Sequence, residues 1–92
     1  MFYYKAMGTT TESFREKLEN EYDWPALYTF KFIVPEQKLD ELKVIFEGHE
    51  ITEKASSKGK YISLTSRVMA QSSDFIINTY IRASKIDGII SL

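Results

Sequence analysis

The sequence predicts a small α+β domain in which two helices cover one face of an antiparallel sheet. Three observations predict this class. Apolar and polar residues alternate in two segments, 26–34 and 61–68, as in half-buried strands. Each segment is followed by apolar residues at helical spacing, and a turn at 56–59 separates the second segment from another strand-like run. The predicted order is therefore strand, helix, strand, strand, helix, strand.

Length and composition indicate one soluble domain. The 92 residues suffice for a single modest core, and 43% hydrophobic with 14% aromatic residues are typical of a globular protein. The 12 basic and 13 acidic residues nearly cancel, so no global field attracts nucleic acid or an anionic membrane. The lack of cysteine excludes a disulfide framework and a thiolate metal site, and no apolar run is long enough to span a membrane. Because the start does not resemble a signal peptide, we expect a cytoplasmic protein.

Residues 1–24 are predicted to form an N-terminal extension to a domain of residues 25–92. Thr9 to Glu12 have the spacing of a capping box, and apolar residues then recur every four positions: Phe14, Leu18 and Tyr22. This pattern predicts a short amphipathic helix that ends before Pro25. Because the helix is too short to be stable alone, it must dock on the domain, dock on a partner or fray. The extension also carries three rings that favour a covered position, over the sheet or against a partner: Phe2, Tyr3 and Tyr4.

The first strand and the first helix follow the extension. One side of the strand carries the predicted core residues Tyr28, Phe30, Phe32 and Val34, and the other side carries Leu27, Thr29, Lys31 and Ile33. Pro35 begins the helix, where its missing N–H costs little, and Gly48 ends it. The apolar stripe of this helix consists of Leu39, Leu42, Ile45 and Phe46.

The second and third strands are predicted to form a hairpin. Residues 49–55 are strand-like but charged, which is typical of an edge strand. The turn between the strands is Ser56-Ser57-Lys58-Gly59. On the third strand, the core side is Ile62, Leu64, Ser66 and Val68, and the other side is Tyr61, Ser63, Thr65 and Arg67.

The second helix and the last strand complete the chain. Ser72 or Ser73 can cap the helix, and the helix dipole favours Asp74 in its first turn. The predicted apolar side of this helix is Phe75, Ile76, Tyr80, Ile81 and Ala83. Residues 86–92 are predicted to form a short strand, in which Gly88 is a weak point or a bulge.

This order of elements predicts the ferredoxin-like arrangement, also called the split βαβ fold. Two strands joined through a helix are then parallel and separated by one other strand, so the first and third strands become central. Both helices are expected on one face of the sheet. The opposite face is mixed in character, neither plainly solvated nor plainly core.

Three stretches of the chain resemble the YbeD-like family of small uncharacterised bacterial proteins: SSKGKYIS, the ending KIDGIISL, and WPALYTFKFIV in the first strand. The resemblance covers roughly residues 24–92. It implies a ferredoxin-like fold similar to the ACT-type regulatory domains of amino-acid enzymes, with an unknown biochemical activity. A link to lipoate metabolism has been suggested for the family, and it assigns a role to no residue of this chain.

Domains with this topology include binders of small molecules and of RNA. ACT-type ligand sites use a glycine in the turn after the first strand, whereas residues 34–37 contain none. RNA-binding sheets stack bases on aromatic side chains. The segment 58–63 begins like the corresponding motif, but Lys60 and Ile62 occupy its two stacking positions. Tyr61 would still face the uncovered side of the sheet, near a small basic surface.

The candidate interaction face comprises Lys31, Lys58, Lys60, Tyr61, Thr65 and Arg67. Its plainer interpretation is a solvated turn and a sheet face whose charge is balanced by Glu50 and Glu53. Tyr61 either packs against the turn or the extension, or it anchors a protein interface. His49 is close in sequence to Glu47, Glu50 and Glu53. Such a cluster on an edge strand is more typical of solvated charge than of zinc binding. No catalytic, cofactor or metal-binding residue is predicted.

We expect a non-enzymatic regulatory or interaction domain that acts through a partner protein or through self-association, such as a homodimer. Two alternatives stay open: a sensor of a small metabolite, and a weak RNA-binding module on the uncovered sheet face. An enzyme is the least expected class, because a two-layer domain with an open sheet face has little natural cleft.

Overall fold

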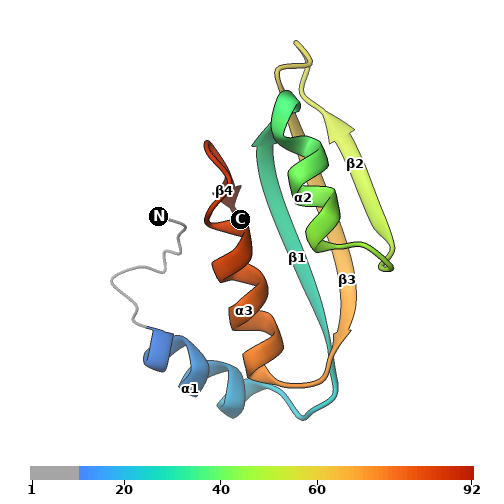
Figure 1. The fold of residues 1–92 in the computed structure, drawn as a ribbon. Coiled ribbons are helices and arrows are strands. Elements are labelled where there is room, and N and C mark those ends of the chain that lie inside the picture. The colour runs from blue at the N-terminus through green and yellow to red at the C-terminus, as the bar shows by residue number, and fades with distance from the viewer. Residues whose placement is uncertain (1–10) are drawn as a thin grey trace.

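The computed structural model describes residues 11–92, which form an α+β domain around one four-stranded antiparallel sheet (Figure 1). A first helix, α1 (Thr11–Glu21), precedes the sheet domain. The remaining elements are β1 (Ala26–Pro35), the 3-10 turn η1 (Glu36–Lys38), α2 (Leu39–Ile45), β2 (Ile51–Ala55), β3 (Tyr61–Ala70), α3 (Ser73–Ala83) and β4 (Ile90–Ser91).

The two longest strands form the centre of the sheet. The strand order is β2-β3-β1-β4, and β1 pairs with β3 along its whole length, from Ala26 opposite Ala70 to Pro35 opposite Tyr61. The expectation that the first and third strands are central is therefore confirmed. Helices α2 and α3 lie side by side on one face of the sheet (Figure 1).

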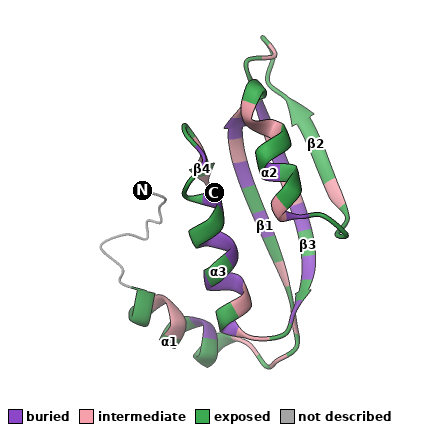
Figure 2. Ribbon diagram, viewed as in Figure 1, coloured by how far each residue is buried: buried purple, intermediate pink, exposed green. Residues whose placement is uncertain are grey.

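The core lies between this face and the helices. Buried and exposed residues alternate along β3, and the predicted core side of β1 is buried from Phe30 to Val34 (Figure 2). Phe30 lies at the centre of an aromatic cluster, with its ring centroid 5.4 Å from that of Phe46 and 5.3 Å from that of Tyr80. Because each ring removes a large apolar area from water, this cluster supplies much of the burial that a domain of this size needs.

The polar groups inside the core have partners. The hydroxyl groups of Tyr28 and Tyr80 are hydrogen-bonded to each other at 2.9 Å. Burial raises the pKa of Tyr28 well above the usual tyrosine value, and the adjacent Tyr80 hydroxyl adds to this effect. Ser66, predicted on the core side of β3, is buried and donates a hydrogen bond to the carbonyl oxygen of Glu50 at 2.8 Å.

Helix α1 packs on the domain, in contact with α3. Leu18 is 3% exposed and belongs to the core, and the ring of Phe14 makes an edge contact with Tyr80 at 5.7 Å between centroids. Arg15 forms an ion pair with Asp74 at the start of α3. Of the three possibilities for this helix, docking on the domain is the one observed. The predicted capping box from Thr9 and the rings of residues 2–4 lie outside the described residues.

Both predicted helices of the sheet domain are present, with corrections at their ends and faces. Pro35 is the last residue of β1, and the helical path begins at Glu36 as a 3-10 turn. Ser72 caps α3, because its side-chain oxygen accepts a hydrogen bond from the Phe75 backbone N–H at 3.2 Å. The prediction that Ile81 is on the buried side was wrong, since it is 42% exposed. Ile77 and Thr79, which were not predicted, are buried on α3.

The edge strands are shorter than predicted. Strand β2 begins at Ile51, not at residue 49, and β4 contains only Ile90 and Ser91. Gly88 lies in the turn before β4, with a φ of 80°, and is not a bulge within the strand. This left-handed backbone conformation belongs to the turn, and β4 begins two residues later, at Ile90.

Candidate interaction face

The face of the sheet opposite α2 and α3 is covered by none of the helices in residues 11–92 (Figure 1). Along each strand, every second side chain points to this face, and the strand registers show which ones. We call this surface the open face. It comprises Leu27, Thr29, Lys31 and Ile33 of β1, Thr52 and Lys54 of β2, Tyr61, Ser63, Thr65, Arg67 and Met69 of β3, and Ile90 of β4.

The register brings three of the predicted interaction residues together. Lys31 is directly opposite Thr65, and Arg67 is opposite Thr29, the next outward-facing residue of β1. Side chains at such positions lie about 5 Å apart at their Cβ atoms. Lys31, Thr65 and Arg67 therefore form one continuous surface in the middle of the open face.

The other three predicted residues lie at one end of the sheet. Tyr61 begins β3, whereas Lys58 and Lys60 belong to the hairpin turn beyond it. Both lysines line a separate hollow of about 580 Å³ beside Glu36 and Tyr61. Lys58 and Lys60 are thus neighbours of the open face rather than members of it.

The hairpin turn fixes the position of Tyr61. Ser56 donates its backbone N–H to the Tyr61 carbonyl oxygen at 2.8 Å, and its side-chain oxygen accepts from the Tyr61 N–H at 3.3 Å. The Gly59 N–H closes the turn on the Ser56 carbonyl oxygen at 2.9 Å. Gly59 has a φ of 72°, which favours glycine, so the SSKG sequence accounts for the turn.

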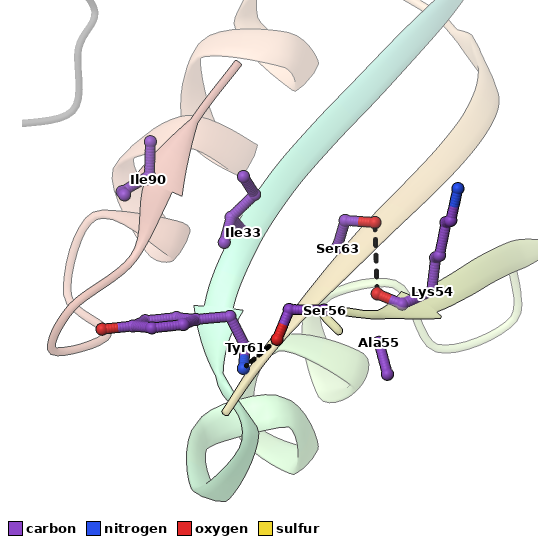
Figure 3. A pocket seen from close by; sticks show the side chains of 7 residues that line it. All are labelled: Ile33, Lys54, Ala55, Ser56, Tyr61, Ser63 and Ile90. Carbon is purple, nitrogen blue, oxygen red and sulfur yellow. Dashed lines mark hydrogen bonds between the residues drawn. The ribbon is translucent and has the colours of Figure 1, made fainter. Parts of the chain in front are cut away.

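A shallow hollow lies on the open face next to Tyr61 (Figure 3). Its volume is about 430 Å³, and it is lined by Ile33, Lys54, Ala55, Ser56, Tyr61, Ser63 and Ile90. Ile33 and Ile90 are direct partners across β1 and β4. The Ser63 hydroxyl donates to the Lys54 carbonyl oxygen at 3.4 Å, so these two polar groups are paired with each other. The surface that the hollow exposes is mainly hydrocarbon.

Large apolar side chains are exposed on the open face outside the hollow as well. Leu27 and Met69 form a cross-strand pair at the far end of β1 and β3, and they are 47% and 54% exposed. Tyr61 and Ile90 are exposed to a similar degree, at 47% and 51%. The open face therefore has an apolar area at each end and a polar, charged middle.

All charged residues of the open face are cations: Lys31, Lys54 and Arg67. Glu50 and Glu53 were predicted to balance this charge. Glu53 does not lie on the open face, and Glu50 precedes β2 and takes part in no ion pair described for residues 11–92. Glu53 pairs in register with buried Leu64, and its carboxylate forms an ion pair with Lys43 Nζ of α2 at 3.2 Å. Its side chain is therefore on the helix side of the sheet.

Four members of the open face were not predicted from the sequence to lie on it: Thr52, Lys54, Met69 and Ile90. Met69 continues the alternation of β3 beyond Val68, where the sequence analysis ended it. Lys54 is placed by the β2 register, and Ile90 by a strand of only two residues. Extension of the alternation to residue 69 could have found Met69.

His49 lies away from the open face. Its ring contacts the ring of Phe75 on α3, with 6.3 Å between centroids. In the part of the chain from residue 11 onward, no three His, Cys, Asp or Glu side chains gather closely enough to hold a metal ion. None of the helices described there is long and apolar enough to cross a membrane.

Comparison with known proteins supports the family resemblance seen in the sequence. Residues 19–92 match the family described as "Protein of unknown function (DUF493)". This is the YbeD-like family that the SSKG turn and the KID ending indicated. The match begins within α1, slightly before the predicted domain start. No curated protein and no solved structure matches the chain.

Proposed function

Because the chain belongs to the DUF493 family, whose members are proteins of unknown function, we propose a function from its geometry. The domain is a non-enzymatic interaction module that binds a partner protein through the open face. A regulatory role and a cytoplasmic location are parts of the same proposal. The lack of cysteine throughout the chain supports the location, since it fits a reducing compartment.

The observation that carries the proposal is the exposure of large apolar side chains on a sheet face that no helix of residues 11–92 covers. A solvated face of an antiparallel sheet is ordinarily polar. Here Leu27, Tyr61, Met69 and Ile90 are about half exposed and flank a charged middle. Aromatic and aliphatic anchors beside cations are typical of a protein interface.

The fold supports the comparison with ACT-type regulatory domains. We propose that the domain is ferredoxin-like, on the basis of the β2-β3-β1-β4 order and the antiparallel pairing of the central strands. The turn after β1 does not offer the Glu36 backbone N–H to a small molecule. The Glu36 backbone N–H there donates to the Lys60 carbonyl oxygen at 3.0 Å, so the hairpin already uses this donor.

The non-enzymatic part of the proposal rests on the position of the single histidine. His49 lines neither of the hollows beside Tyr61. It is held against Phe75 on the helix side. The hollows therefore lack the imidazole that most often serves as a general acid or base.

Photo-crosslinking in bacterial cells tests the proposal. A photoreactive amino acid at Thr29, exposed on the open face, should give discrete adducts with another protein. The matched control is Asn78, which is exposed on α3. Equal adducts from both positions, or none from Thr29, would contradict the use of the open face. Stabilisation by a metabolite with no adduct from Thr29 would favour a small-molecule sensor instead.

A further inference from the structure

We propose that the partner presents an acidic amphipathic segment, with a large apolar side chain in the hollow beside Tyr61 and carboxylates on the cations of the open face. This inference rests on the proposed function and specifies its partner.

No ion pair described within residues 11–92 involves a cation of the open face. The ion pairs described there are Arg15 with Glu12 and Asp74, Lys38 with Glu41, and Lys43 with Glu53. Lys31, Lys54 and Arg67 take part in none of them. Since the whole chain has a net charge of −1, the open face is positive on an otherwise acidic protein. Such a local field favours an anionic partner.

The cations lie in three successive rows, where a row is a set of open-face side chains that lie opposite one another on adjacent strands. Arg67 is in the row of Thr29, Lys31 is in the next row, and Lys54 is in the row of Ile33 and Ser63. Tyr61, opposite Pro35, begins the row beyond. From the row of Tyr61 to that of Arg67 is six residues, or about 20 Å along the strand. An extended segment of about seven residues can therefore contact the hollow and all three cations.

The size and lining of the hollow indicate which apolar group of the partner it can hold. Its volume of about 430 Å³ and its walls of Ile33, Tyr61 and Ile90 can accept one large side chain from a partner. Lys54 lines the same hollow, so a carboxylate next to that side chain would meet a cation.

Two other occupants fit the open face less well. A second copy placed face to face would bring cations against cations, which opposes association. Among residues 11–92, nucleic acid would find one aromatic ring on the open face, that of Tyr61. Sheets that bind single-stranded RNA stack two or three bases. An acidic peptide needs only one apolar anchor and the cations.

Selection from a random library of 12-residue peptides, displayed on phage and exposed to the immobilised full chain, tests the inference. We expect enriched peptides to be acidic and to contain a large apolar residue. The best synthetic peptide should lose at least about tenfold in affinity when Lys31→Glu and Arg67→Glu are combined. The neutral pair Lys31→Gln and Arg67→Gln should give a smaller loss.

The control is a pair with the same change of charge outside the open face, Lys17→Glu in α1 and Lys85→Glu in the turn after α3, which should leave the affinity unchanged. Thermal unfolding of each variant distinguishes lost binding from lost structure. No enrichment, or enrichment of neutral or basic peptides, would overturn the inference. So would tighter binding of a 12-nucleotide oligouridine, or a dimer that depends on Lys31 and Arg67. If crosslinking from Thr29 gives protein adducts but the library yields no acidic peptides, the proposed function is supported and only the acidic nature of the partner is contradicted.

Discussion

Gly88 lies directly against Pro35, so that a Cβ atom built on Gly88 would be 2.9 Å from the Cγ atom of the proline ring. Gly88 also has a φ of 80°, in the region that side chains rarely adopt. The turn before β4 and the end of β1 can therefore approach each other only because residue 88 has no side chain.

Replacement of Gly88 by alanine should destabilise the domain through both effects. We expect a loss of about 2–4 kcal/mol in the free energy of unfolding, since backbone strain and overpacking of a rigid ring add. Gly59→Ala is the matched control, because Gly59 has a φ of 72° but nothing lies within 4 Å of its added Cβ. It should lose only about 1–2 kcal/mol. Urea unfolding measures both, and equal losses would show that the Pro35 contact is unimportant.

The hydroxyl pair of Tyr28 and Tyr80 should contribute cooperatively to stability. Either single change to phenylalanine leaves the other buried hydroxyl without this hydrogen bond, at a cost of about 1–2 kcal/mol. The double variant Tyr28→Phe with Tyr80→Phe should lose less stability than the sum of the single losses, because neither hydroxyl is then left without the other. A double-mutant cycle from urea unfolding measures this, and additive losses would contradict the coupling.

The same pair predicts a decline of stability in alkaline solution. Burial raises the pKa of both Tyr28 and Tyr80 in the folded protein, so the folded state disfavours tyrosinate. Their contribution is fully present below the unfolded tyrosine pKa of about 10 and is lost as the pH rises above it. Unfolding measured from pH 8 to 11 should show this decline, and the double phenylalanine variant should show a shallower one. Identical slopes would exclude these two residues as the cause.

Helix α1 should contribute to the stability of the sheet domain. Leu18→Ala removes a core side chain that is 3% exposed, and we expect a loss of about 2–4 kcal/mol. Lys17→Ala, at an exposed position of the same helix, should change stability by less than about 0.5 kcal/mol. A fragment of residues 25–92 should unfold at a lower temperature than the full chain. An unfolding temperature equal to that of the full chain would contradict this prediction and would show that residues 1–24 do not stabilise the domain.

The side chain of Ser56 should matter for the hairpin, and through it for the position of Tyr61. Ser56→Ala removes the acceptor of the Tyr61 N–H, with an expected loss of about 0.5–1.5 kcal/mol. Ser57→Ala, one residue along the same exposed turn, is the control. Hydrogen exchange of the Tyr61 amide should accelerate only in the first variant. Acceleration in both would indicate a general loosening of the turn.

The sequence predicts the central part of this fold well because local patterns determine it. Alternation in β1 and β3 defines their two faces, and a helix dipole and a serine cap define the start of α3. The rotation of α3 was less predictable. Ile77 and Ile81 are equally apolar, and packing against the sheet decides which of them is buried.

The errors at the candidate interaction face have a similar cause. Glu53 and Lys54 are adjacent in a charged edge strand, and only the register with β3 decides which of them faces the helices. A shift by one residue would exchange them, and a strand without a clear apolar side does not specify that register. The close approach of Gly88 to Pro35 was not predictable for a related reason, since it joins residues far apart in the sequence.

The alternation of β1 and β3 has an evolutionary consequence. Every second residue of these strands belongs to the core, while its neighbours on the open face contribute little to it. Mutations at Thr29, Lys31, Thr65 or Arg67 can therefore change the chemistry of the open face at small cost to folding. A domain built in this way can change by drift on one side of its sheet while selection for folding acts on the other.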